Sequence, residues 1–157
     1  MRPDIERHVR LVLPSLRSFW SLMIAASVAL AGLGVLASPV ASLSGTTTAT
    51  PVTAATTVFG VLCAAATIWL DRAILTPGRI ASAMPIPDHT LAQRHLLAGH
   101  LALWSLAEVP ALLGFAQLLL DGALGTHLAL CAVSLTVLAL LMPTRARIAA
   151  RMTAALR

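Results

Sequence analysis

Glu108 is the residue of this chain best placed to do chemistry, because it lies deep inside a long apolar segment. It stands near the middle of residues 95–120, in the run WSLAEVPALLGF that covers residues 104–115. An ionised, unpaired carboxylate in the hydrocarbon of a membrane costs about 3 kcal/mol or more. Carboxyl groups kept at that depth usually carry a proton or ion, or hydrogen-bond one helix to another. Both kinds of chemistry are therefore open to Glu108.

The polar residues expected at the same depth define a candidate site. We predict that Glu108, Ser105 and Ser134 form an ion- or proton-binding site or an interhelical anchor. Trp104 and His100 lie on the same segment, toward its inner end, and are candidate contacts for a ligand or a partner. Depth matching of the apolar segments adds three further polar neighbours: Ser27, Thr57 and Cys63. No Arg or His is expected at that depth, so burial favours the neutral acid over the carboxylate.

Residues 105–115 resemble the ion-binding helix of the proteolipid (c-type) subunits of rotary ATP synthases. In that family the pattern ALxEAxAIYGL surrounds the carboxylate that carries the ion. The resemblance implies that Glu108 is the ion-carrying carboxylate and that Gly114 is the glycine six residues later. It is local to this segment, and it does not assign the whole chain to a family.

Other arrangements of reactive residues do not point to catalysis or to a cofactor. His100 and His127 are expected in opposite leaflets, so they cannot ligate one haem. Cys63 and Cys131 lie in apolar segments and are expected to be buried small side chains. The sequence has no phosphate loop, no nucleophile elbow, no HExxH motif and no acid pair. We therefore predict a protein that is not an enzyme, with no metal site and no cofactor.

The composition predicts that the chain spans a membrane. Of its 157 residues, 58% are hydrophobic and only 11% are charged, against about 25% charged residues in soluble domains. A hydrocarbon core needs about 20 helical residues, and backbone polar groups must be paired inside it. Residues 1–157 are therefore predicted to form one all-α membrane domain, an antiparallel bundle of two hairpins. Its four transmembrane helices are expected at residues 18–38, 52–70, 95–120 and 123–142.

The arginines predict how the helices are oriented. All eleven cationic residues are Arg, and every one lies before the first span, between spans two and three, or after the fourth. Cytoplasmic loops carry the excess of basic residues, so both termini are predicted to be cytoplasmic (N-in, C-in). We expect a bacterial inner membrane location and contacts between the inner arginines and anionic lipids. Nucleic acid is not an expected partner.

Three segments are predicted to lie on the inner side. Residues 1–17 have apolar residues at helical spacing between arginines, which favours an amphipathic helix in the headgroup layer. Residues 71–94 form the inner loop, and Asp88 can cap an early start of the third helix, which would then run from about residue 89 to 120. Residues 143–157 form a C-terminal tail.

Three functions are compatible with these features. The favoured one is a non-catalytic accessory or structural subunit of a larger membrane complex, for example an energy-transducing one, with Glu108 as an intramembrane polar anchor. The expected partners are other integral membrane subunits, hydrogen-bonded by Glu108, or further copies of this chain. The second is proteolipid-like handling of protons or Na⁺ through Glu108. The third is binding of a hydrophobic ligand, such as quinone, pigment or lipid, near Trp104 and Glu108.

Overall fold

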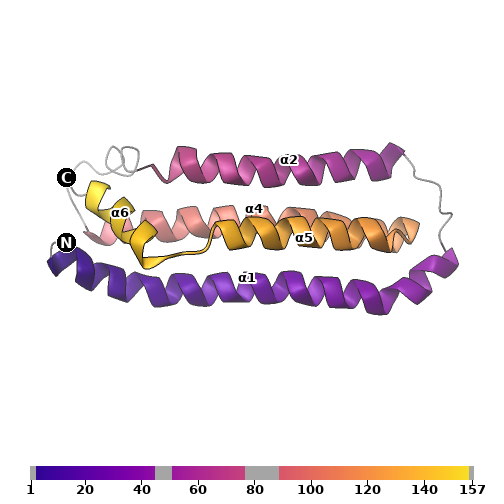
Figure 1. Ribbon diagram of the computed structural model, residues 1–157, viewed down its shortest axis with the longest axis horizontal. Helices are drawn as coiled ribbons and strands as arrows, with labels where there is room; N and C mark the ends of the chain where they lie inside the picture. Colours follow the sequence, from indigo (N-terminus) through magenta and orange to yellow (C-terminus); the bar gives the residue numbers. More distant parts are fainter. Residues whose placement is uncertain (1–2, 45–50, 77–88, 156–157) are drawn as a thin grey trace.

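Five helices make up almost all of the structure, a computed structural model that describes residues 3–44, 51–76 and 89–155. They are α1 (Pro3–Ser44), α2 (Pro51–Ile74), α4 (His89–Asp121), α5 (Leu124–Leu140) and α6 (Arg145–Ala155). Figure 1 shows the four long helices side by side, each antiparallel to the one before it along the chain. The short α6 lies at the end of the bundle where α1 begins, called here the α6 end. The predicted all-α class is confirmed.

Three of the helices are long and apolar enough to cross a membrane by themselves: α1, α2 and α4. The fourth, α5, has 17 residues and meets this criterion only together with α6, from which it is bent by 57°. The chain is thus a small multi-span helical membrane protein. The predicted start of the third helix near residue 89 is confirmed, because α4 begins at His89. The proposed cap, Asp88, lies outside the described residues.

The helix α4 is the centre of the bundle. It packs against α1, α2 and α5, and half of its most apolar membrane-length stretch is buried. The helices α1 and α2 follow each other in the chain but lie on opposite sides of the α4–α5 pair (Figure 1). The first predicted hairpin is therefore antiparallel, but its two helices are held together by α4 and α5, with few contacts between them.

A tight turn joins α4 to α5. Gly122 has a positive φ of 67°, a conformation that costs a residue with a Cβ about 1 kcal/mol or more. Its backbone N–H donates to the carbonyl of Leu118 at 3.0 Å, which pairs one of the carbonyls left open at the end of a helix. The turn holds α5 close against α4 over their length.

The predicted interfacial segment, residues 1–17, and the first predicted span are parts of one helix in the described chain. Within the described residues the segment continues without a break into the span as part of α1. Val9, Val12 and Leu16 are buried in the same apolar cluster as Ile148 and Met152 of α6. The apolar side that was predicted to face the headgroup layer is thus covered by protein, in a cluster that includes residues of α4 and of α6 in the predicted tail.

The predicted tail contains the helix α6. Pro143 favours the end of α5, since a proline has no N–H to donate and disfavours helical backbone at the residue before it. Thr144 then starts the new helix, because its hydroxyl accepts from the N–H of Arg147 at 3.3 Å. The predicted inner loop is also shorter than expected at its start, because α2 continues to Ile74.

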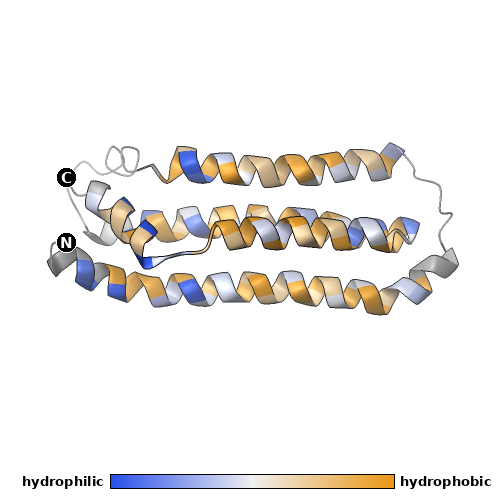
Figure 2. Ribbon diagram, in the orientation of Figure 1, coloured by the Kyte–Doolittle hydropathy of each residue, from blue (hydrophilic) through white to orange (hydrophobic). Residues whose placement is uncertain are grey.

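Hydropathy separates the middle of the bundle from its ends. Figure 2 shows mostly hydrophobic residues along the central parts of α1, α2 and α5, whereas hydrophilic residues gather at the α6 end. Several large apolar residues of α2 are exposed, among them Val58, Phe59, Leu62 and Trp69. This surface is suited to contact with lipid or with other membrane helices, and not with water.

Candidate functional site

The carboxyl group of Glu108 lies inside the bundle, between α4 and α1. Its side chain is 8% exposed, and Ser27 of α1 is fully buried beside it. Ser27 Oγ is 3.0 Å from Oε1 and 2.9 Å from Oε2 of Glu108. A serine hydroxyl has one hydrogen, so it can donate to only one of these oxygens at a time. Glu108 is therefore anchored within its own chain.

The surroundings of Glu108 suit the neutral acid. Ser27 is a single neutral donor, whereas a carboxylate removed from water needs several donors or a cation to replace its hydration. A protonated Glu108 can instead donate its O–H to Ser27 Oγ, and the serine hydroxyl is then available to a backbone carbonyl of its own helix. The arrangement can hold a proton, and it can hydrogen-bond α1 to α4.

Ser134 hydrogen-bonds the backbone of α4 next to Pro110 and does not contact the carboxyl group of Glu108 directly. Pro110 has no N–H and so leaves the carbonyl of the preceding turn without its usual donor. The next residue, Ala111, directs its backbone N–H to Ser134 Oγ at 3.0 Å. Ser134 is fully buried. It therefore joins α5 to α4 one turn from Glu108, through the backbone.

His127 hydrogen-bonds α5 to α1 in the half of the bundle that lies away from the α6 end. His127 is fully buried, and its Nε2 lies 3.1 Å from the carbonyl oxygen of Leu30. A carbonyl only accepts, so Nε2 carries the hydrogen and Nδ1 is free to face Cys131 Sγ at 3.7 Å. The helices approach closely here, since a Cβ built on Gly34 would lie 2.1 Å from Nε2 of His127.

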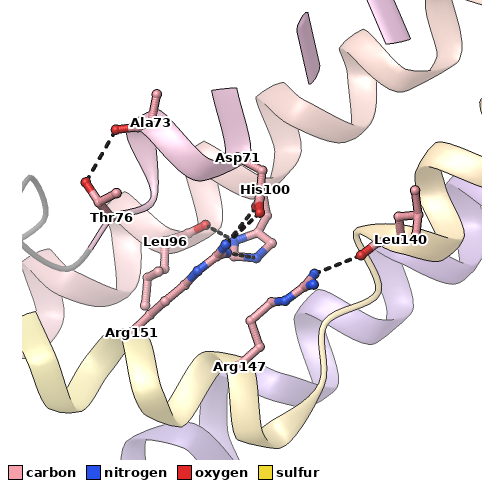
Figure 3. A network of polar contacts seen from close by, with 8 residues as sticks. All are labelled: Asp71, Ala73, Thr76, Leu96, His100, Leu140, Arg147 and Arg151. Carbon is pink, nitrogen blue, oxygen red and sulfur yellow. Dashed lines mark hydrogen bonds and ion pairs between the residues drawn. The ribbon is translucent and has the colours of Figure 1, made fainter. Parts of the chain in front are cut away.

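A second polar cluster lies at the α6 end and links three helices (Figure 3). Arg151 of α6 directs Nη2 to both carboxylate oxygens of Asp71 of α2, each at 2.8 Å. Its Nη1 lies 3.2 Å from Nε2 of His100 on α4. Because arginine only donates, Nε2 accepts, and the hydrogen is on Nδ1, which faces the carbonyl of Leu96 at 2.7 Å. The neutral tautomer of His100 is thus fixed from both sides.

This ion pair is well shielded from solvent. The side chains of Arg151 and Asp71 are 11% and 12% exposed. Nearby, Arg147 Nη1 donates to the carbonyl oxygen of Leu140 at 2.9 Å, one of the carbonyls that the end of α5 leaves open. The arginines of α6 therefore attach the C-terminal helix to the bundle as well as carrying charge.

Trp104 lies between the two polar groups along α4. It is fully buried, and its ring is 5.5 Å from that of His100, centroid to centroid. Within the described part of the chain its indole N–H has no hydrogen-bond partner. An indole N–H usually finds a partner when it is buried, so this unpaired donor is an unusual feature of the described bundle.

The opposite end of the bundle has a smaller polar group. Gln117 Nε2 of α4 donates to the carbonyl oxygen of Thr53 at 2.9 Å, and the hydroxyl of Thr53 is hydrogen-bonded to Asp121. Both contacts join α2 to α4. The buried stripe of α4 therefore carries polar side chains near both ends and at its centre, and each of them faces another helix of the bundle.

The predicted site residues thus fall in three places. Glu108 is buried with Ser27, which the sequence offered only as one of several neighbours at that depth, and Ser134 contacts the backbone next to it. Ser105 is exposed on the surface of α4. His100 and Trp104 are buried together, and His100 also accepts from Arg151. The ion pair of Arg151 with Asp71 was not predicted from the sequence. The four-residue spacing of Ile148 and Met152, in a segment that also carries Arg145, Arg147 and Arg151, was the available signal for the helix α6.

In the ranges 3–44, 51–76 and 89–155, no group of three or more His, Cys, Asp or Glu residues is placed to hold a metal ion. Comparisons with protein-family models, with curated proteins and with solved structures find no match for this chain.

Proposed function

We propose that this chain is a non-catalytic accessory subunit of a larger membrane complex, in which Glu108 is a polar anchor between two of its own helices. Three buried polar side chains of the central helix are hydrogen-bonded to neighbouring helices: Glu108 to α1, Gln117 to α2 and His100 to α6. The outer faces of α1 and α2 are apolar, and only 11% and 22% of their most apolar membrane-length stretches are buried. In this proposal the chain packs against other subunits through its outer faces and takes no part in a reaction.

The observation that carries the proposal is an exposed small-residue face on α1. Ser21, Ala25, Ala29 and Gly32 follow each other at four- and three-residue spacing, and all are exposed. A Cβ built on Gly32 would meet no atom within 4 Å. Small residues at this spacing let membrane helices approach closely. We propose that another membrane helix packs on this face.

A pair of small residues inside the bundle illustrates how such residues let two helices pack closely. Gly60 and Ala64 of α2 have the same spacing, and both are buried. A Cβ on Gly60 would lie 3.2 Å from a side-chain carbon of Leu130 and 3.6 Å from the Cα of Pro110. Here the small residues bring α2 close to α4 and α5. The small-residue face of α1 has the same pattern, but none of the described helices packs on it.

Adjacent alanines offer a matched test. Ala25 and Ala26 are both exposed and lie about 100° apart around α1, so only Ala25 is on the small-residue face. The tagged chain is purified in a mild detergent, and the retained proteins are identified by mass spectrometry. The proposal predicts other membrane chains at fixed stoichiometry, their loss with Ala25→Leu and their retention with Ala26→Leu. A lone chain, or equal loss with both variants, contradicts it.

Proton handling through Glu108 is a second candidate, and the neutral surroundings of the carboxyl group favour it. A buried acid with one hydroxyl partner can accept and release a proton if water reaches it. This function predicts that a hydrophobic carbodiimide labels Glu108, and that acidification changes the labelling rate. Absence of labelling at Glu108 at every pH, with labelling of a detergent-unfolded sample as the control, would exclude it.

The proposed orientation has both termini in the cytoplasm of a bacterial cell. The described arginines support it, since they lie in the α6-end parts of α1, α2 and α4 and in α6: Arg7, Arg10, Arg17, Arg72, Arg94, Arg145, Arg147 and Arg151. Basic residues mark the cytoplasmic side.

A further inference from the structure

A groove of about 400 Å³ opens at the α6 end, between α1 and the start of α6. Three of its lining residues are arginines: Arg10, Arg17 and Arg145. The other three are apolar: Val9, Leu13 and Pro14. Cationic groups over an apolar wall are the combination that an amphiphile with an anionic head would contact.

The cations of the groove are held in place and still have donors to offer. Glu6 Oε1 accepts from Arg10 Nη2 at 3.0 Å and from Arg145 Nη2 at 2.6 Å. Hydrogen bonding and charge from Arg10, and then the charge of Arg145, hold the pKa of Glu6 below its usual value, so the carboxylate persists at neutral pH. One carboxylate between two arginines leaves a positive balance. Each guanidinium has five N–H donors, and each pair occupies one nitrogen.

The third arginine increases that positive balance. Among the described residues, Arg17 makes no ion pair, and it is the last charged residue of α1 before its apolar stretch. Arg10 lies seven residues earlier, about 10 Å further from the membrane centre at 1.5 Å per residue. The headgroup region of one leaflet is about 5–8 Å thick. Arginines near membrane surfaces keep the aliphatic stem in the hydrocarbon and direct the guanidinium toward water. The guanidinium of Arg17 can therefore reach the headgroup layer from the hydrocarbon side.

We propose that this groove binds the phosphodiester headgroup of an anionic phospholipid, with Arg10, Arg17 and Arg145 around the phosphate and Leu13 and Pro14 against the start of the acyl chains. Guanidinium groups bind phosphate oxygens in bidentate geometry. A free phosphate ion would leave the apolar wall of the groove without a partner, whereas a lipid covers both parts. The site goes beyond the packing function, because it assigns a ligand to a defined place on the chain.

The test measures lipid binding to the full chain in detergent by native mass spectrometry. Phosphatidylglycerol and phosphatidylcholine with identical acyl chains are titrated separately. We expect one tightly held phosphatidylglycerol, preferred over phosphatidylcholine, because each arginine near an anionic headgroup contributes about fivefold. The variant Arg10→Gln/Arg17→Gln should lose most of that preference. The control is Arg72→Gln, an exposed arginine of α2 outside the groove, which should keep it.

Each remaining outcome decides against the site. Equal affinity for both lipids would show that the groove does not distinguish an anionic headgroup from a zwitterionic one. An equal loss of preference with Arg72→Gln shows that charge anywhere at the α6 end is enough. Displacement of the bound lipid by millimolar inorganic phosphate shows a site for a soluble anion. Because the altered side chains are exposed, circular dichroism should show the same helical content in all variants, so a loss of binding is not a loss of fold.

Discussion

The hydrogen bond between Ser27 and Glu108 predicts a specific energetic coupling between α1 and α4. Among the described residues, Ser27 is the one side chain hydrogen-bonded to the carboxyl group of Glu108, which is 8% exposed, and Ser27→Ala removes it. Leaving a buried polar group without its partner costs about 1–3 kcal/mol. Hydrogen bonds between membrane helices are worth less, about 0.6 kcal/mol on average and about 1.7 at most in double-mutant cycles. We therefore expect Ser27→Ala to lower the free energy of unfolding by about 1–2 kcal/mol.

A double-mutant cycle isolates this bond from the effects of each substitution. Unfolding is followed in mixed micelles for Ser27→Ala, Glu108→Leu and the double variant. A leucine side chain in place of the carboxyl group needs no donor, so the further loss of Ser27 should then cost little, and the coupling energy should be about 1 kcal/mol. Ser105→Ala is the matched control, because Ser105 is an exposed serine one turn from Glu108. A coupling energy within about 0.3 kcal/mol of zero, or a Ser105→Ala cost equal to that of Ser27→Ala, refutes the intrachain anchor.

Two further substitutions test the contacts around this anchor. Gly34→Ala would place a Cβ 2.1 Å from Nε2 of His127, so we expect a loss of about 1–3 kcal/mol from overpacking; thermal unfolding should show no such loss for Gly32→Ala, where the space is open. Asp71→Asn leaves Arg151, 11% exposed, without its counter-ion, and the expected loss is about 3 kcal/mol or more. Limited proteolysis should then release α6 from the bundle, and a protected α6 would show that the ion pair is not what attaches it.

The fold was predictable because a membrane leaves few alternatives. Apolar runs of about 20 residues must be helices in hydrocarbon, and their positions follow from hydropathy alone. The start of α4 near residue 89 was also predicted from the sequence. Hydropathy did not predict the bend between α5 and α6, nor the burial of Val9 and Leu16 in one cluster with residues of α6. An amphipathic segment looks the same in sequence whether lipid or protein covers its apolar side.

The partner of Glu108 was predictable only in part. Depth along the helices brings Ser27 and Ser134 to the level of the carboxyl group, but depth does not say how each helix is rotated about its axis. Ser105 lies one turn from Glu108 and is nevertheless exposed, whereas Glu108 is buried against Ser27 of α1. Asp71 and Arg151 are 80 residues apart, and pairing them requires knowing that the tail folds back as a helix at the same end.

The claim that the exposed face of α1 packs against another protein is tested most directly by cross-linking in intact membranes. A small photoreactive side chain is placed at Ala25 in one variant and at Ala26 in another, and the products are identified by mass spectrometry. If another membrane chain packs on this face, position 25 should give a cross-link to that chain and position 26 a weak product or none. Cross-links to lipid alone, to a second copy of this chain, or equally from both positions would contradict it.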